Sequence, residues 1–199
     1  MNNTRRSQTC CNRRQWLRMT AGAGTWAAFP AWAGEGPAPQ QHSPSAVLVR
    51  ELAPAEAESA QHSPLVACAR QLKRAGGHNC AELILTAAIK CYDLPRQTGE
   101  AAAAFGGGVG HGELCGFLTG ASMALGAISF KGGGERAEVK KRLKVWNEAL
   151  WTWWKSVAPL NCRDLRPHYD KIGFENMMTR VCLQVEKIVG DRRGAAARS

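Results

Sequence analysis

Cysteine thiols are the groups in this sequence best placed to do chemistry. Eight cysteines occur in 199 residues, and Cys10 and Cys11 fall in the N-terminal segment. The other six do not form paired CxxC units and lack a CxxCH haem-attachment sequence, so their spacing does not predict a zinc ribbon, a ferredoxin motif or covalent haem. Cys80, Cys115 and Cys162 lie at or near predicted helix starts, where backbone N–H groups and the helix dipole favour a thiolate. A thiolate can bind a metal or attack a disulfide.

The remaining cysteines have plainer surroundings. Cys182 lies inside the last predicted helix between Val181 and Leu183, a setting that by itself is typical of a core position. Cys80 and Cys91 are about three turns apart in one predicted helix, too far for a disulfide between them. Cys68 and Cys91 could pair with each other and leave four cysteines for a site.

A glycine-rich stretch, "FGGGVGHGELCGFLTGASMALG", spans residues 105–126 and contains Cys115. It lacks the Gly-Lys-Ser/Thr ending and the preceding strand of a phosphate loop, and no βαβ pattern surrounds it. We expect residues 106–112 to form a tight loop whose backbone passes close to a redox site. The glycines predicted to approach a cofactor there are Gly107, Gly108, Gly110 and Gly116. Within the following helix, glycines cost stability, and Gly116, Gly120 and Gly126 therefore indicate close packing against another backbone.

The helices that position these groups are predicted from apolar spacing and from capping residues. Asn79 is the expected N-cap of one helix, and Pro64 opens another. Ala and Leu are common while Val and Ile are sparse, which favours helix. We predict an all-α fold of about five helices around one core. In the longest helix, the predicted buried face comprises Val139, Leu143, Trp146, Leu150, Trp153 and Val157.

The first 33 residues have the pattern of an export signal. Arg13 and Arg14 precede a weakly apolar segment that ends in an A-x-A cleavage sequence before Gly34. The paired arginines with the following Trp16 resemble a twin-arginine signal. That route exports folded proteins, so we expect passage through the twin-arginine translocase to the periplasm or another exported location. Residues 34–63 are predicted to be a Pro/Ala-rich linker, 64–190 the helical domain, and 191–199 a tail.

The charge balance excludes one class of partner. All five basic residues before Gly34 leave with the signal, so the rest carries 21 basic and 16 acidic side chains, a net charge of +5. This mild excess gives no reason to expect nucleic-acid binding. We also expect no membrane span in the mature protein, because no later segment reaches the roughly 20 apolar residues required.

The order of these motifs resembles a known family. An Asn-Cys-Ala helix start, the glycine stretch with its Cys-Gly-x-x-x-Gly, the sequence "NCRDL" and a cysteine in the final helix are similar to the C-GCAxxG-C-C family of redox-active proteins. The resemblance covers roughly residues 77–189. It implies that the family's four cysteines are Cys80, Cys115, Cys162 and Cys182. Phe117 departs from the pattern, because family members usually carry a smaller residue there.

The resemblance implies a redox role and an iron–sulfur cluster, with the four cysteines as metal ligands. Four thiolates suit both two-iron and four-iron clusters, and the function would then be electron transfer or redox sensing with a redox partner protein. Such a chain is a redox module rather than a defined catalyst. The alternatives are a metal-free thiol–disulfide protein, a structural zinc site with four cysteines, and a structural domain with inert thiols.

Overall fold

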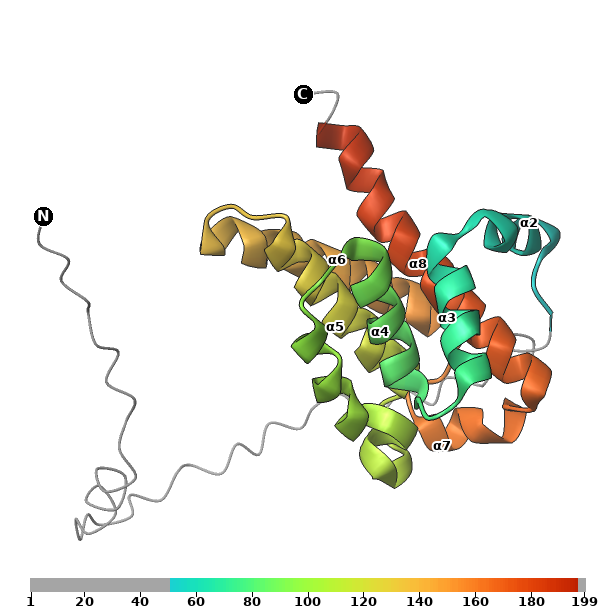
Figure 1. Cartoon of the computed structure of the whole chain (residues 1–199). Helices are drawn as coiled ribbons and strands as arrows, with labels where there is room; N and C mark the ends of the chain where they lie inside the picture. Colours follow the sequence, from blue (N-terminus) through green and yellow to red (C-terminus); the bar gives the residue numbers. More distant parts are fainter. Residues whose placement is uncertain (1–50, 197–199) are drawn as a thin grey trace, which may run out of the picture. The chain divides into compact units, whose positions relative to one another are not determined.

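The computed structural model describes residues 51–196, and it confirms the predicted all-α fold (Figure 1). The described part holds seven α-helices rather than about five. The predicted signal segment, residues 34–50 of the predicted linker, and residues 197–199 lie outside the described residues. The helices are α2 (Pro54–His62), α3 (Pro64–Ala75), α4 (Cys80–Tyr92), α5 (Gly116–Lys131), α6 (Arg136–Val157), α7 (Cys162–Leu165) and α8 (Lys171–Ala196). Short 3-10 turns occur at Arg96–Thr98, Glu100–Phe105 and Arg166–His168, and an irregular turn at Gly108–Gly112.

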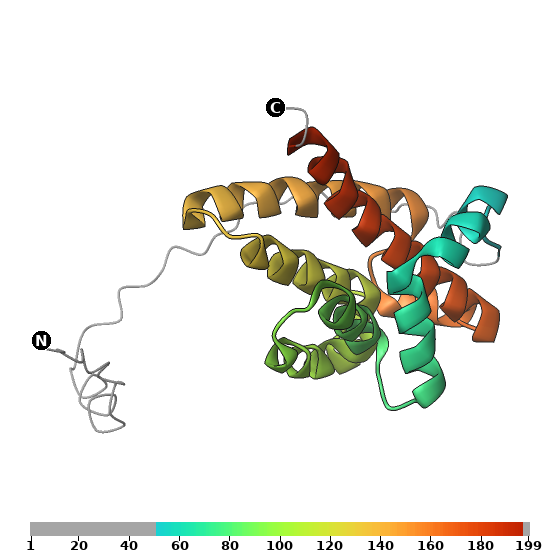
Figure 2. The same cartoon turned by 45° about the horizontal axis from the view of Figure 1, so that its top comes forward.

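Helix α4 lies at the centre of the domain. It contacts α3 on one side and α5 on the other, while α8 packs across α3 and α5 (Figure 1). Helix α6 runs beside α5 and also contacts α8, an arrangement seen clearly in Figure 2. Eight of the thirteen residues of α4 are buried, so this helix forms much of the core and holds Cys80 at a fixed position.

The start of α4 is fixed by a capping box, as Asn79 predicts. The Asn79 carboxamide oxygen accepts from the N–H groups of Ala81 (2.9 Å) and Glu82 (3.1 Å). The Glu82 carboxylate accepts in return from the Asn79 N–H at 2.9 Å. The Asn79 side chain also donates to the carbonyl of Ala103 at 3.0 Å. These bonds satisfy the free donors of the first turn and tie it to the segment before the glycine loop.

Replacement of Asn79 by alanine is expected to lower the free energy of unfolding by about 1–2 kcal/mol, because the cap is lost. Urea denaturation followed by circular dichroism measures the change. Asn161→Ala is a matched control, since Asn161 precedes α7 but its side chain makes no capping hydrogen bond. We expect that control to change stability by less than about 0.5 kcal/mol. Equal losses in the two variants would contradict the assigned role of the Asn79 cap.

Close packing of α5 on α4 occurs where two of the three helix glycines predict it. A Cβ atom on Gly120 would lie 2.6 Å from the carbonyl oxygen of Ala81 and 2.9 Å from its Cα. A Cβ atom on Gly116 would lie 2.9 Å from the carbonyl oxygen of Phe105. The prediction is wrong for Gly126, which has no neighbouring atom within 4 Å of that position. The first two turns of α5 therefore lie directly against the start of α4.

The buried face of α6 follows the predicted spacing with one addition. Val139, Trp146 and Leu150 are buried, and three more predicted positions are partly buried. Trp154 is fully buried instead of its neighbour Trp153, and its indole N–H donates to the carbonyl of Pro159 at 3.0 Å. This bond closes the turn that leads from α6 toward Cys162.

Helix α2 occupies residues that the sequence predicts as linker. Its Glu56 forms an ion pair of 3.1 Å with Arg180 of α8, and Arg180 also donates to the backbone carbonyl of Glu51. The helical domain therefore includes residues before Pro64. At the other end, α8 continues through Ala196, beyond the predicted end of the domain.

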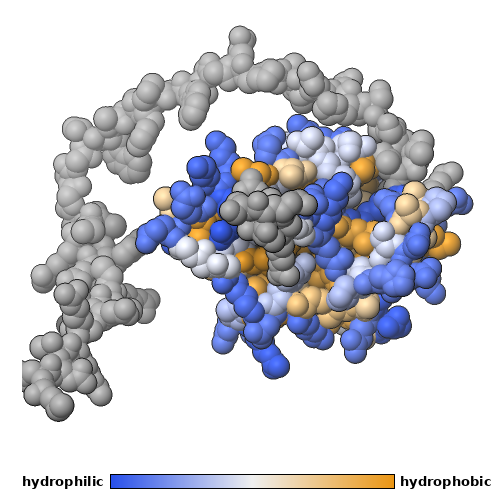
Figure 3. Space-filling model, turned by 90° about the horizontal axis from the view of Figure 1, so that it is seen from above, coloured by the Kyte–Doolittle hydropathy of each residue, from blue (hydrophilic) through white to orange (hydrophobic). Residues whose placement is uncertain are grey.

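The outer surface mixes polar and apolar side chains. Figure 3 shows apolar residues lying between hydrophilic ones on one face of the described part. Among residues 51–196, none of the helices has the length and apolar character required to cross a bilayer.

Candidate functional site

A short antiparallel bridge brings two of the predicted site cysteines together. It joins the segments that lead into α5 and α7. The N–H of Cys115 donates to the carbonyl of Leu160 at 2.9 Å, and the N–H of Cys162 donates to the carbonyl of Glu113 at 2.6 Å. Side chains alternate along extended segments, so Cys115 and Cys162 are diagonal neighbours on the same face of the bridge.

The third cysteine reaches this place from the start of α4. A Cβ atom on Gly116 would collide with the Sγ of Cys80, so the Cys80 thiol lies against the backbone next to Cys115. Cys80, Cys115 and Cys162, here named the three-thiol site, have exposed fractions of 9%, 0% and 4%. Three separate helix starts therefore place three buried thiols around one point, and the absence of a side chain at Gly116 makes room for one of them.

Aromatic side chains cover the Cys115 side of the three-thiol site. The hydroxyl oxygen of Tyr169 lies 3.7 Å from the Sγ of Cys115. Phe117 packs edge-on against Tyr169, with ring centroids 6.0 Å apart, and against Phe174 at 4.9 Å. Phe117 is fully buried. The larger residue at this position is thus accommodated by a cluster of aromatic rings that also orients Tyr169.

Burial shifts the pKa of Cys115 and of Cys162 in the opposite direction from the sequence-based expectation. Burial raises the pKa of Cys115 to about 12, although hydrogen bonds from Tyr169 and from the backbone of Phe117 lower it. Burial also raises the pKa of Cys162, which the neighbouring Arg166 lowers in part. The pKa of Tyr169 is raised too, chiefly by burial. In these positions the loss of hydration outweighs the helix-start effect, so without a bound cation Cys115 and Tyr169 hold their protons at neutral pH.

The glycine loop is as tight as predicted, and its glycines differ in what they contact. Gly107, Gly108 and Gly110 have φ values of 61°, 67° and 74°, a region that non-glycine residues rarely adopt. A Cβ on Gly108 would collide with the backbone of Glu113, whereas one on Gly107 would lie 3.4 Å from the guanidinium of Arg166. Gly110 faces open space. Of the four predicted cofactor-contacting glycines, Gly116 is the one against a site sulfur.

An open groove of about 530 Å³ lies beside the loop, and the residues that line it are Gly110, His111, Gly112, Arg163, Arg166 and Pro167. Arg163 forms an exposed ion pair of 3.0 Å with Glu113. Because Arg166 acts on the Cys162 thiol, the groove carries positive charge next to the three-thiol site.

Residues 78–191 match the family model described as "Putative redox-active protein (C_GCAxxG_C_C)". The match covers more than half of the chain. The protein belongs to the C_GCAxxG_C_C family. No curated protein matches the sequence, and no solved structure matches it.

The structure separates Cys182 from the other three cysteines that the C_GCAxxG_C_C resemblance assigns to the site. Cys182 is fully buried, and the thiols that act on it are Cys91 and Cys68. Cys91 stands eleven residues after Cys80 in α4, a distance of roughly 16 Å along the helix axis. Cys182 of α8 therefore faces the C-terminal end of α4, where Cys91 lies, and not the N-terminal end, where Cys80 lies. The sequence predicts the last helix and places Cys182 in it, but it does not predict which part of α4 Cys182 faces.

A second thiol group is thus present, formed by Cys68, Cys91 and Cys182. Reasoning from the sequence names Cys68 and Cys91 as a possible pair but places Cys182 elsewhere. One sequence feature does predict that Cys68 and Cys91 are close. They lie in α3 and α4, and the short connection between these helices makes them antiparallel neighbours.

Alkylation should distinguish the cysteines of this C_GCAxxG_C_C protein by accessibility. In the reduced, metal-free native protein, iodoacetamide is expected to modify the exposed Cys91 before the fully buried Cys115 and Cys182, although the pKa of Cys91 is raised to about 11 and slows its reaction. Trypsin cuts after lysine and arginine, which places the six cysteines on six different peptides. Mass spectrometry of samples quenched over time can therefore follow each thiol, and urea-unfolded protein is the control. Equal native rates would contradict the burial described above.

Proposed function

We propose that this protein is an exported redox protein that carries an iron–sulfur cluster at the three-thiol site and serves in electron transfer or redox sensing. The observation that carries the proposal is the convergence of Cys80, Cys115 and Cys162 from three helix starts. Membership of a family described as redox-active supports the chemistry. Zinc is the weaker alternative because zinc undergoes no redox change.

The donor set suits a cluster in number, chemistry and burial. Cysteine thiolates are the usual protein ligands of iron–sulfur clusters, and three thiols face one buried point here. Within residues 51–196, no three histidine, cysteine, aspartate or glutamate side chains form a set for a metal ion as placed. Cluster ligands bind different irons and so stand farther apart than ligands of one ion. Cys80, Cys115 and Cys162 would hold the cluster. Its fourth ligand would be a group other than the Cys182 thiol.

When bound, the cluster would supply one-electron redox chemistry, and the neighbouring side chains would tune it. Tyr169 keeps its proton because burial raises its pKa, so its hydroxyl can donate to the Cys115 sulfur. Arg166 brings a positive charge that lowers the pKa of Cys162 in part. Hydrogen bonds and positive charge near the sulfurs favour the more negative, reduced state and thus raise the reduction potential. The aromatic cover over Cys115 excludes water.

Export fits this assignment. The proposed route is the twin-arginine translocase, recognised through Arg13 and Arg14, because it moves proteins that are already folded and loaded with a cofactor. In the periplasm the protein would exchange electrons with a separate redox protein. The groove beside Arg163 and Arg166 is an open surface next to the proposed centre, because Arg166 also acts on the Cys162 thiol.

A second candidate is a metal-free thiol–disulfide function at the same three thiols. The raised pKa of Cys115 and of Cys162 favours it over an empty thiolate site, since neutral thiols can stand together without a metal. In that case two of the three would cycle between dithiol and disulfide. The exported compartment, which is oxidising, is compatible with either function.

The deciding experiment is anaerobic purification of the exported protein without chelator, followed by a visible spectrum and by iron and zinc analysis. We expect broad visible absorbance and stoichiometric iron. Cys115→Ser should lose both, while Cys182→Ala, a change of an equally buried cysteine outside the site, should retain them. Circular dichroism confirms that each variant is folded. A colourless, iron-free protein would overturn the cluster assignment, and loss of iron in Cys182→Ala alone would overturn the choice of ligands.

A further inference from the structure

The second thiol group lies away from the proposed redox centre, and its three thiols differ in solvent exposure. Cys91 is exposed near the end of α4, Cys68 of α3 is half-buried, and Cys182 of α8 is completely buried. Burial and the neighbouring Cys68 thiol raise the pKa of Cys91 to about 11, and the Cys68 and Cys91 thiols both act on Cys182. The two thiols are carried by α3 and α4, which pack against each other. Cys68 also lies outside the residues that match the family model. The matched family segment therefore does not account for the pair.

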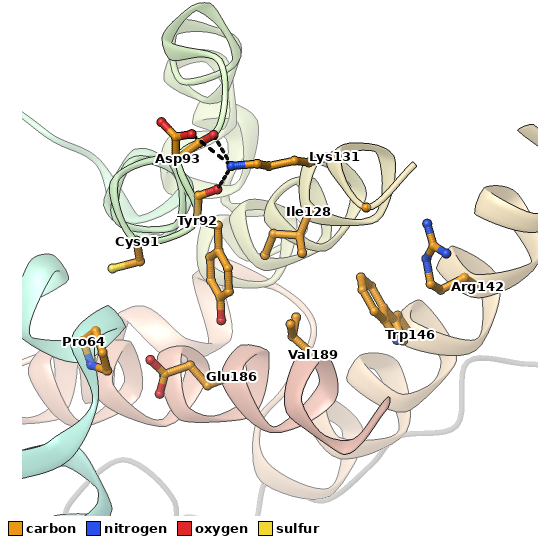
Figure 4. A pocket seen from close by; sticks show the side chains of 11 residues that line it. Pro64, Cys91, Tyr92, Asp93, Ile128, Lys131, Arg142, Trp146, Glu186 and Val189 are labelled. Atoms are coloured by element: carbon orange, nitrogen blue, oxygen red, sulfur yellow. Dashed lines mark hydrogen bonds and ion pairs between the residues drawn. The ribbon is translucent and has the colours of Figure 1, made fainter. Parts of the chain in front are cut away.

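Cys91 is open to molecules in solution. It lines an open groove of about 900 Å³ together with Pro64 of α3, Tyr92 and Glu186 of α8. Figure 4 shows Cys91 on the side of this groove where Pro64 and Glu186 also lie. The Glu186 carboxylate accepts from the N–H of Leu65 at 3.0 Å, which fixes the start of α3 beside α8. An incoming disulfide can therefore reach Cys91, whereas the half-buried Cys68 does not line the groove.

We propose that Cys68 and Cys91 form a thiol–disulfide exchange site that takes small or protein disulfides from the exported compartment as its oxidant. The Cys91 thiolate attacks one sulfur of the incoming disulfide, which releases one thiol and leaves a mixed disulfide on Cys91. The Cys68 thiolate then attacks the Cys91 sulfur, which forms the Cys68–Cys91 bond and releases the second thiol. The protein loses two electrons and two protons, and the incoming disulfide is reduced to two thiols.

The helix arrangement determines what the new bond would do. Helices α3 and α4 form a hairpin around the connection at 76–79, and the bond would cross-link its two arms. The cross-link closes a loop that contains the Asn79 cap and Cys80, so it restrains the hairpin in the unfolded chain. Oxidation at this pair should therefore raise the unfolding temperature, and reduction by a dithiol should lower it again.

The test uses the full chain, reduced, freed of reductant and exposed to oxidised glutathione at pH 8. After acid quenching and blocking with N-ethylmaleimide, trypsin without reductant should yield residues 51–70 joined to residues 91–96. Cys68→Ser should accumulate glutathione on Cys91 instead, because the second step is blocked. Cys182→Ala, a change of the buried third thiol, should keep the joined peptides.

Two outcomes would overturn the proposal. One is a wild-type protein in which Cys91 retains glutathione and the joined peptides do not form. The other is a bond from Cys91 to a cysteine other than Cys68. Circular dichroism and the iron content of each variant are measured in parallel. Cys91→Ser is expected to keep its iron whether or not this exchange occurs, so failure here is distinguishable from failure of the proposed cluster.

Discussion

Replacement of Gly120 by alanine is expected to destabilise the protein substantially. The new methyl group would lie 2.6 Å from the carbonyl oxygen of Ala81 and 2.9 Å from its Cα, which are backbone atoms that cannot rotate away. Overpacking of a tight core typically costs about 1–3 kcal/mol and occasionally more. The gain in helix propensity from glycine to alanine is only about 1 kcal/mol, so we expect a net loss and a displaced α5.

Gly126→Ala is the matched control because the same change occurs in the same helix with open space around it. No atom lies within 4 Å of the added methyl group, so only the propensity gain of up to about 1 kcal/mol remains. Urea denaturation of the two variants should therefore show shifts of opposite sign. A stable Gly120→Ala protein would mean that α5 does not lie as close to α4 as described, and the contact of Gly116 with the Cys80 sulfur would then also be in doubt.

Phe117→Ala is expected to lower the free energy of unfolding by about 3–5 kcal/mol, the usual cost of removing a buried phenylalanine side chain. Phe117 is fully buried and contacts the rings of both Tyr169 and Phe174. Its loss leaves a cavity at the core side of the site. We also expect the hydrogen bond between Tyr169 and Cys115 to weaken, because Phe117 holds the Tyr169 ring edge-on.

The control for this variant is Phe130→Ala at the other end of α5. Phe130 is 46% exposed, and the Arg136 guanidinium lies 5.7 Å from its ring centroid. We expect a loss of less than about 1 kcal/mol there. Denaturation curves measure stability, and the alkylation rate of Cys115 reports the state of its cover. Similar losses for the two phenylalanines would show that the aromatic cluster does not support the site.

Local signals gave reliable predictions for the helices and their starts. The sequence predicts Asn79 as the N-cap of α4 and Pro64 as the first residue of α3, and the structure confirms both. The structure adds the reciprocal Glu82 bond and the Ser63 cap. These features depend on neighbours within one turn, so the chain encodes them directly. The close approach at Gly116 and Gly120 is different, because a glycine permits such contact but the packing of α5 on α4 decides which glycines make it.

Predictions that depend on packing were less complete. Gly126 has the same residue type as Gly120 but meets open space, because the helical twist over the six positions from one to the other places Gly126 on another face of α5. The core face of α6 includes Trp154 rather than Trp153 as its fully buried member. Such shifts of one residue cannot be read from spacing alone, because adjacent positions on a helix differ by about 100°.

For the thiols, too, some properties follow from the sequence and others only from the tertiary structure. The sequence by itself determined that the protein is helical, that Cys80, Cys115 and Cys162 stand at helix starts, and that a glycine loop precedes Cys115. Only the tertiary structure decided that Cys182 lies with Cys68 and Cys91, because this depends on the position at which α8 packs along α4. The tertiary structure also decided the protonation of Cys115. Its pKa reflects removal of water by Phe117, Tyr169 and the surrounding helices, which outweighs the local helix-start effect.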